Sequence, residues 1–216
     1  MRQLITGVAG FLAVAVVCGA DTTVSPVRKW AWGENIGWLN WRDANGGLQG
    51  VRHSRSFLSG FIWGENVGWI NVGNGAPSGG TYANINNTNF GVNVNPDTGE
   101  CSGFAWGENI GWINFSTVSS LGAQGARYDA FSGRFSGFAW GENVGWINLN
   151  DAGQFVCTFA ADLNADGIVS TPDLVPFLGA FGDLVTPGDR GDFNGDGLVS
   201  TPDLVIFLGQ FGRQCS

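Results

Sequence analysis

Two segments near the C-terminus place oxygen-bearing side chains at alternate positions of a short loop, which is the pattern of a calcium site. They begin at Asp162 and Asp192 and read DLNADGIVSTPDL and DFNGDGLVSTPDL. A hard cation such as Ca2+ takes six to eight oxygen ligands, and alternate residues of a tight loop point their oxygen atoms inward. Gly167 and Gly197 stand where such a loop must turn sharply. The sequence therefore predicts two bound calcium ions.

The predicted ligands occupy the same positions in both loops. Each loop has three Asp and one Asn as side-chain ligands, an apolar residue that would supply its backbone carbonyl, and a Ser that would act through a water. In the first loop they are Asp162, Asn164, Asp166, Ile168, Ser170 and Asp173, and in the second Asp192, Asn194, Asp196, Leu198, Ser200 and Asp203.

Each loop leads into a short segment with the spacing of an amphipathic helix. Thr171-Pro172 and Thr201-Pro202 look like an N-cap followed by proline at the first helical position. Pro176 lies inside the first helix, which we therefore expect to be shorter or bent. Two such helices can bury a shared apolar seam. Its residues, at i, i+3, i+4 and i+7, are Leu174, Phe177, Leu178, Phe181, Leu204, Phe207, Leu208 and Phe211.

The segment from about residue 160 to 212 resembles the type I dockerin family, whose module is a duplicated calcium loop and helix. Both copies follow the register D-x-N-x-D-G-x-V-x-x-x-D-L and end in Asp where an ordinary EF-hand has Glu. The resemblance implies calcium-dependent folding and docking to a cohesin-like partner or an extracellular scaffold. It also implies two pseudo-symmetric docking modes. The candidate docking residues are Thr171, Thr201 and Pro202, and the second helix is the better docking face because Pro176 removes a backbone donor from the first.

Cysteine usage supports a closed C-terminal segment. Cys157 and Cys215 bracket it, so a disulfide between them would tie its two ends together. Closing a loop of that length stabilises by roughly 4 kcal/mol in the chain-entropy model. Cys101 is then unpaired. It stands where the next repeat has Phe135, and we expect a buried small apolar residue rather than a reactive thiol.

A second set of polar residues recurs in four copies of one string: WAWGENIGWLNW, FIWGENVGWINV, FAWGENIGWINF and FAWGENVGWINL. One hypothesis is a multivalent glycan-binding rim, since aromatic platforms beside carboxylate and amide groups hold sugars. The other is turn chemistry, with the Trp residues in the core. Four equivalent Glu lack the asymmetry that glycoside hydrolysis requires. The residues in question are Glu34, Asn35, Glu65, Asn66, Glu108, Asn109, Glu142 and Asn143.

Each copy predicts a β-hairpin, because two alternating runs flank a short Gly-containing turn. With residues 108–110 as the loop, Trp106 would face Trp112 across the hairpin. Residues 91–106 align with 125–140 without a gap, which adds a strand and makes the unit a three-stranded meander. Such repeats rely on their neighbours to bury apolar surface. The spacing leaves open a ring, a barrel or a sandwich, in which the incomplete first unit is a terminal cap or is completed by a strand from elsewhere.

Composition excludes several classes of protein. The 216 residues include 36 Gly and carry a net charge of -8, which disfavours both a mainly helical fold and nucleic-acid binding. A hydrophobic content of 44% argues against disorder. His53 is the single histidine, and no nucleotide-binding motif is present. We therefore expect no catalysis, and a packed or exposed His53.

The N-terminus predicts export. Arg2, an apolar run over 8–17 and Gly19-Ala20 have the order of a secretory signal peptide. A lipid-modified Cys18 is the weaker alternative. The run is too short to span a bilayer, and no other stretch approaches the ~20 apolar residues that a membrane helix needs. We expect a secreted protein, extracellular or at the cell surface.

The chain thus divides into a signal peptide (1–20), a linker (21–29), a four-copy Trp-rich β-repeat domain (30–155) and a dockerin-like calcium-binding domain (156–216). The expected fold class is mainly β, with repeated three-stranded meander or hairpin units followed by a small α-helical calcium-binding module. The expected function is non-catalytic docking to a cohesin-like partner or scaffold. The alternative is a carbohydrate-binding accessory protein in polysaccharide degradation.

Overall fold

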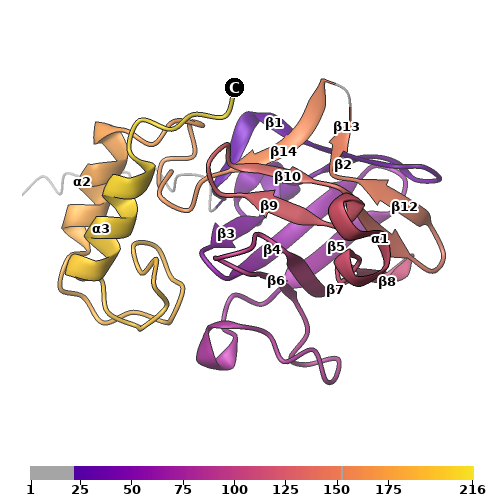
Figure 1. Ribbon diagram of the computed structural model, residues 1–216, viewed down its shortest axis with the longest axis horizontal. Helices are drawn as coiled ribbons and strands as arrows, with labels where there is room; N and C mark the ends of the chain where they lie inside the picture. The colour runs from indigo at the N-terminus through magenta and orange to yellow at the C-terminus, as the bar shows by residue number, and fades with distance from the viewer. Residues whose placement is uncertain (1–21, 152) are drawn as a thin grey trace, which may run out of the picture.

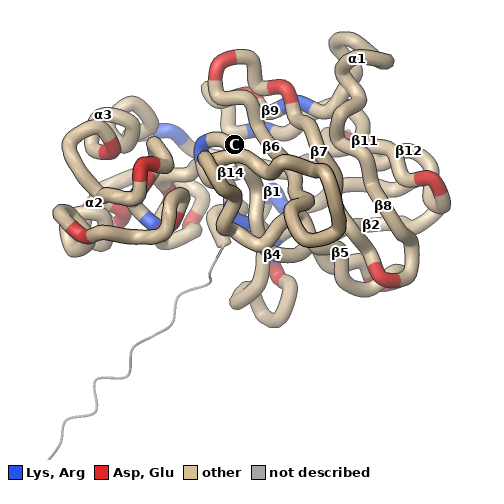
Figure 2. The backbone as a smooth tube through the Cα atoms, turned by 90° about the horizontal axis from the view of Figure 1, so that it is seen from below, with Lys and Arg blue, Asp and Glu red and all other residues tan. Residues whose placement is uncertain are grey.

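The computed structural model describes residues 22–151 and 153–216, and the expected signal peptide lies outside them. Most of the regular structure is strand, and helices α2 (Thr171–Gly179) and α3 (Thr201–Gln210) lie together at one side of the strands (Figure 1). The view from below shows the same arrangement (Figure 2). The protein is mainly β, as the composition predicts. No helix of the described residues is long and apolar enough to cross a membrane.

Eight antiparallel strands form a closed barrel. They are neighbours in the order β12, β11, β8, β7, β5, β4, β2, β1, and β12 pairs with β1 to close the ring. Of the arrangements that the repeat spacing left open, the structure has the barrel. Its strands are β1 (Val24–Gly33), β2 (Gly37–Asn40), β4 (Phe57–Gly64), β5 (Gly68–Gly73), β7 (Cys101–Gly107), β8 (Gly111–Asn114), β11 (Phe138–Gly141) and β12 (Gly145–Asn148).

Each of the four repeats contributes one hairpin to this barrel. In the third, Trp106 pairs with Trp112 and Gly107 with Gly111 around a three-residue loop, as predicted. The same register recurs in the other hairpins. The loop is tight because its apolar residue folds back over the first Gly: a Cβ on Gly107 would lie 2.5 Å from Ile110 Cγ1. Gly at this position of the repeat is therefore a packing requirement.

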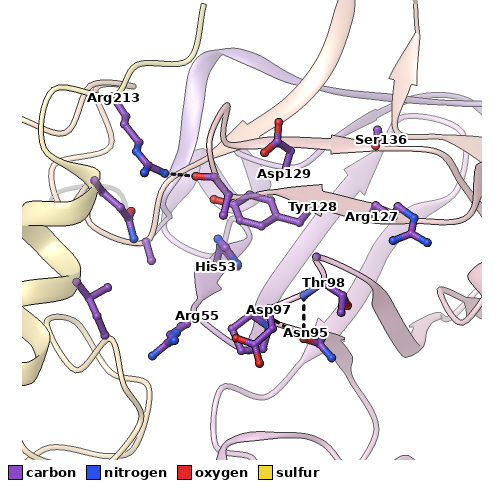
Figure 3. Close-up of a pocket in the computed structure, with 16 residues that line it drawn as sticks. His53, Arg55, Asn95, Asp97, Thr98, Arg127, Tyr128, Asp129, Ser136 and Arg213 are labelled. Carbon is purple, nitrogen blue, oxygen red and sulfur yellow. Dashed lines mark hydrogen bonds between the residues drawn. The ribbon is translucent and has the colours of Figure 1, made fainter. Parts of the chain in front are cut away.

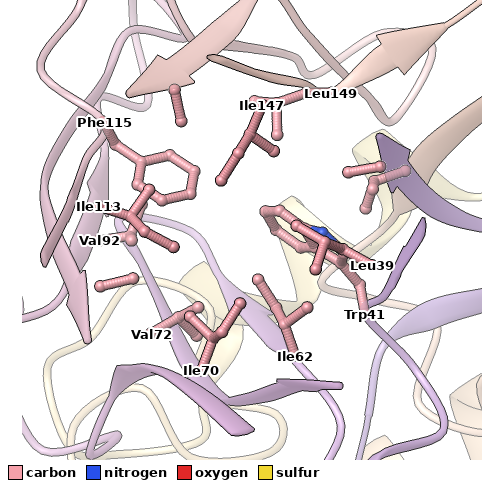
Figure 4. Close-up of a cluster of buried hydrophobic side chains, with 14 of the residues drawn as sticks. Leu39, Trp41, Ile62, Ile70, Val72, Val92, Ile113, Phe115, Ile147 and Leu149 are labelled. Carbon is pink, nitrogen blue, oxygen red and sulfur yellow. The ribbon is translucent and has the colours of Figure 1, made fainter. Parts of the chain in front are cut away.

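Side chains from alternate positions fill the barrel interior in layers (Figure 4). An eight-stranded barrel is just wide enough for its interior to be filled by side chains. One layer consists of the second apolar residue of each returning strand: Leu39, Ile70, Ile113 and Ile147. The layer next to it consists of the residues two positions later: Trp41, Val72, Phe115 and Leu149.

This packing contradicts one of the two alternatives, in which the repeat tryptophans lie in the core. Within the described residues Trp41 alone among the ten is fully buried, and it lies outside the W-G-E-N-x-G-W string. The two tryptophans of each hairpin point away from the barrel interior. The physical reason is volume, because the interior takes the Ala, Ile and Leu positions and leaves no space for eight indoles.

Further strands extend the sheet beyond the barrel. β3 (Arg52–Ser54) pairs with β4, and β6 (Val92–Val94) pairs with both β4 and β7. Four more strands follow: β9 (Arg127–Asp129), β10 (Arg134–Ser136), β13 (Asn150–Asp151) and β14 (Gln154–Thr158). β14 pairs with β1 and β10, so a strand from beyond the last repeat lies against the first. β1 begins at Val24, and residues 24–29 are strand where a linker was expected.

The remaining helical turns of the barrel region are short. They are α1 (Val118–Leu121) and the 3-10 turns Ala44–Gly47, Ser78–Gly80 and Gly122–Gln124. α2 and α3 share a separate core with the preceding loops, in which the ring of Phe177 stacks on Phe207 and Phe193 at centroid distances of 5.5 and 5.8 Å. The predicted seam is only partly formed. Of its eight residues Phe177 and Phe207 are fully buried, whereas Leu178, Phe181, Leu208 and Phe211 are exposed.

The helix starts differ from the prediction by one residue. The N-caps are Ser170 and Ser200, each in a capping box with the Asp three residues later. The Asp carboxylate accepts a hydrogen bond from the backbone N–H of the N-cap Ser, which is 2.8 Å long between Ser170 N and Asp173 Oδ2. This capping box makes Ser the N-cap in place of Thr. α2 is nine residues long against ten for α3, which agrees with the shortening expected from Pro176.

Candidate functional site

The second predicted calcium loop brings three carboxylates together. Oxygen atoms of Asp192, Asp196 and Asp203 all lie within 4.8 Å of one another. Asp192 is 2% exposed and Asp203 is fully buried. Buried carboxylates are costly when ionised unless a cation or hydrogen bonds compensate them. These three residues are the expected ligands at positions 1, 5 and 12 of the loop.

Backbone N–H groups hold the carboxylates of this loop in place. Asp192 accepts from Gly197 at 2.9 Å and from Gly195 at 2.7 Å, and Asp203 accepts from Asn194 at 3.0 Å. The Asn194 side chain in turn donates to Asp196 at 2.8 Å. The carboxylates of the loop thus hold its backbone in a tight turn through hydrogen bonds. Each Asp196 oxygen accepts one hydrogen bond and keeps a lone pair that a hard cation could use, whereas each oxygen of Asp192 and Asp203 accepts two.

The first loop repeats this pattern. Asp162 accepts the N–H of Gly167 at 2.8 Å, and Asp173 accepts that of Asn164 at 3.0 Å. The pKa of Asp162 is raised to about 7, chiefly by burial; the hydrogen bond from the Gly167 N–H opposes this rise, and the neighbouring carboxylates of Asp173 and Asp166 add to it. A bound cation would remove this penalty. Figure 2 shows acidic residues gathered around α2 and α3 and, separately, at the hairpin turns.

Each of the two loops forms a β-bridge with the segment that follows the helix of the other loop. Ile168 forms a bridge with Gln214 beyond α3, and Leu198 forms one with Leu184 beyond α2. Each predicted calcium loop is therefore paired with the segment that follows the other helix. The predicted disulfide between Cys157 and Cys215 is present and joins the two ends of this unit.

The four asparagines of the hairpin turns form a ring of hydrogen bonds. Each side-chain amide donates to a backbone carbonyl of the neighbouring hairpin's loop, at 3.0–3.2 Å. The four bonds close the circle, since the first hairpin reaches back to the last. The pairs, donor first, are Asn35–Val144, Asn66–Ile36, Asn109–Val67 and Asn143–Ile110. The amide N–H groups thus hold adjacent repeats together, whereas the Glu side chains point into solvent.

Loss of one amide of this ring should weaken the barrel measurably. We expect Asn109→Ala to lower the free energy of unfolding by about 1 kcal/mol, since it removes one inter-repeat hydrogen bond. Asn109→Asp should cost at least as much, because a carboxylate cannot donate to the Val67 carbonyl. Asn87→Ala, in an exposed loop, is the control. Chemical denaturation followed by Trp fluorescence measures all three, and an Asn109→Ala variant as stable as the control would contradict the ring's role.

Aromatic side chains cover the outside of the barrel in four equivalent groups. The two tryptophans of each hairpin meet edge to face, with ring centroids 4.6–5.2 Å apart. A third aromatic ring extends each pair at 5.6–6.4 Å. These pairs are about one-third exposed, whereas a packing role would bury them. The members, with the third ring first, are Trp30, Trp32 and Trp38; Phe61, Trp63 and Trp69; Phe104, Trp106 and Trp112; and Phe138, Trp140 and Trp146.

His53 lines a cavity between the barrel and the helices (Figure 3). The cavity holds about 480 Å3. Burial lowers the pKa of His53 to about 3, and its ring lies 4.3 Å from that of Tyr128. Among the described residues neither ring nitrogen has a hydrogen-bond partner. His53 is thus a packed, neutral side chain, one of the two alternatives that the sequence left open.

The remaining residues singled out from the sequence are Cys101 and the candidate docking residues. Cys101 is a free, buried thiol in the barrel core, and burial raises its pKa, so it is not poised as a nucleophile. Thr171, Thr201 and Pro202 are exposed at the starts of α2 and α3. No family model matches the sequence, and no curated protein or solved structure shows significant similarity to it.

Proposed function

We propose that this is a secreted, non-catalytic protein that binds two calcium ions through a dockerin-like C-terminal module and displays a repeat domain. In this proposal each repeat is a three-stranded unit, and the module docks to a cohesin-like partner or an extracellular scaffold. The observation that carries it is the convergence of Asp192, Asp196 and Asp203 in a loop whose register the first loop repeats.

Exposed apolar side chains on both helices support the docking part. Val175 and Leu178 on α2, and Val205 and Leu208 on α3, are each more than half exposed. They occupy equivalent positions of the duplicated unit, which is what two interchangeable docking modes require. Surface of this kind on a small module is typical of a protein-protein interface.

Binding of a cohesin domain to the immobilised full chain tests the proposal. We expect binding with calcium and none with chelator. Leu178→Asp or Leu208→Asp alone should leave one docking mode, with the greater loss for Leu208→Asp, and the double variant should abolish binding. Leu48→Asp, in an exposed turn of the barrel, is the matched control. Equal binding in chelator, or wild-type binding by the double variant, refutes docking through these helices.

The second candidate is carbohydrate binding by the repeat domain, for which the exposed tryptophan pairs are the specific support. Aromatic surface beside carboxylates on a rigid barrel is the composition of a saccharide site. In this proposal Glu65 and Glu142, which lie beside aromatic rings of the neighbouring hairpin, contact the glycan. The neighbouring asparagine amides are already committed to the inter-repeat ring, so they leave only their carbonyl oxygens for a ligand.

A further inference from the structure

Two grooves lie between neighbouring hairpins on the outside of the barrel, at the same repeat positions. The groove of the first and second hairpins has Trp30 and Trp38 on one side and Glu65 on the other, and holds about 410 Å3. The groove of the third and fourth hairpins has Phe104, Trp112 and Glu142 at the equivalent positions, and holds about 270 Å3. Each groove thus combines an aromatic platform from one repeat with a carboxylate from the next.

The two grooves face opposite sides of the barrel. The first crosses the pair β2–β4, and the second crosses β8–β11. In the closed ring, β5 and β7 separate these pairs on one side, and β1 and β12 separate them on the other. One extended ligand cannot occupy both grooves without passing around the molecule.

A loop walls the second groove. The third repeat begins 43 residues after the second (104 − 61), against 31 between the first two (61 − 30), and the extra chain includes residues 84–90. Phe90 packs edge to face on Trp112 at 5.0 Å. The Asn89 side chain accepts the N–H groups of Ile85 and Asn86 at 2.9 and 3.1 Å, which fixes the loop. Side chains of Asn84, Asn86 and Asn87 line the groove.

The chemistry of the linings selects the class of ligand. Among the described residues neither groove is lined by Lys or Arg, so an anionic ligand would meet only the repulsion of a glutamate. Amides line both grooves, as Asn40 and Gln154 in the first and the loop asparagines in the second. Amides and a carboxylate bind hydroxyl groups, and the aromatic rings bind the apolar C–H face of a sugar.

We propose that each groove binds one neutral glycan chain, so that the protein bridges two chains. The aromatic platform stacks on a sugar ring, and the glutamate of the next repeat accepts hydrogen bonds from its hydroxyl groups. This proposal rests on the carbohydrate-binding candidate function and is independent of calcium-dependent docking. It also moves the binding surface from the Gly-Glu-Asn rim to the side of the barrel.

Titration calorimetry on the full chain in calcium tests the stoichiometry. The probes are soluble neutral hexasaccharides of β-1,4-glucan, β-1,4-xylan, β-1,4-mannan and α-1,4-glucan. We expect two sites per chain for at least one of them. Trp112→Ala and Glu142→Gln should each weaken the second site by about tenfold or more, and Trp38→Ala and Glu65→Gln the first, since buried aromatic and charged contacts dominate such sites.

The repeat supplies matched controls from the other two hairpin interfaces. Trp146→Ala and Glu108→Gln change the same positions of the string and should leave both sites intact. Light scattering with the corresponding high-molar-mass glycan should rise for the wild type and not for Trp112→Ala, because one site cannot bridge.

Three results overturn the proposal. They are no binding to any hexasaccharide, equal loss of binding in Glu108→Gln and Glu142→Gln, and binding of tetramethylammonium in place of the sugars. The last would indicate an aromatic cage for a cation. Cohesin binding by the same groove variants is measured in parallel. It should be unchanged, so failure of the glycan sites is distinguishable from failure of docking.

Discussion

Removal of calcium should unfold residues 157–216 and leave the barrel folded. Eight of the 18 acidic residues lie in that segment, and Asp162, Asp173, Asp192 and Asp203 are buried. Without a cation, ionised carboxylates in such positions oppose folding. Each ion present at 1,000 times its dissociation constant would contribute about 4 kcal/mol to the stability of the folded segment.

The positions of the tryptophans allow the barrel to be monitored separately from the C-terminal segment. All ten Trp lie between residues 30 and 146, so their fluorescence reports on the barrel alone. In chelator we expect unchanged Trp fluorescence together with new proteolytic cleavage between about residues 183 and 197. Proteolysis is the readout for the helices, and mass spectrometry identifies the sites.

Matched variants distinguish the loss of a proposed calcium ligand from the loss of a negative charge elsewhere in the segment. Asp203→Asn should make the segment sensitive to protease even with calcium, whereas Asp183→Asn, at an exposed position outside both ligand sets, should not. The Cys157–Cys215 disulfide keeps the fragments joined, so samples are reduced before analysis. Unchanged resistance of the C-terminal segment in chelator would show that the loops do not depend on a cation.

The features that could be predicted from the sequence are those set by residues close together in the chain. The hairpin register around residues 108–110 follows from strict alternation on both sides of a fixed turn, and the predicted Trp106–Trp112 pairing is confirmed. The ligand spacing of the C-terminal loops is local in the same sense. The Cys157–Cys215 pair, which only brackets a segment, is also confirmed.

The inside and outside of the barrel could not be read from the same alternation. Both faces of each hairpin are apolar, with Trp on one and Ala, Ile or Leu on the other. Closing eight strands gives an interior of fixed width, and that width selects the smaller side chains. Ala105 is fully buried while Trp106 next to it is exposed. Only the closed geometry, which is not encoded in any single repeat, decides the matter.

The pairing of strands far apart in the sequence could not be predicted either. β14 pairs with β1 although more than 100 residues separate them, and no local sequence pattern indicates such a contact. The exposure of Leu178 and Leu208 has a similar cause. Phe177 and Phe207 fill the contact between the two helices, whereas Leu178 and Leu208, one position later, lie outside that contact. The sequence shows an apolar stripe, whereas burial depends on what packs against it.

Trp41 carries the largest single packing contribution that the barrel offers to test. It is 1% exposed, and its ring lies 5.5 Å from that of Phe135 and 6.3 Å from that of Phe115. The equivalent positions of the other repeats hold Val72, Phe115 and Leu149, so one large ring fills space that its smaller counterparts leave. We expect Trp41→Ala to lower the free energy of unfolding by about 3–5 kcal/mol.

The repeat again provides the control. Trp146→Ala removes the same side chain from the outer face, where it is 36% exposed, and should cost less than Trp41→Ala, about 1–2 kcal/mol. Trp41→Phe should cost less than Trp41→Ala, because it keeps most of the buried ring and removes an indole N–H that has no partner among the described residues. Urea denaturation followed by far-UV circular dichroism compares the three variants without relying on the altered fluorophores. If Trp41→Ala and Trp146→Ala destabilised equally, the two faces of the barrel would be wrongly assigned, and the saccharide grooves on the outer face would lose their basis.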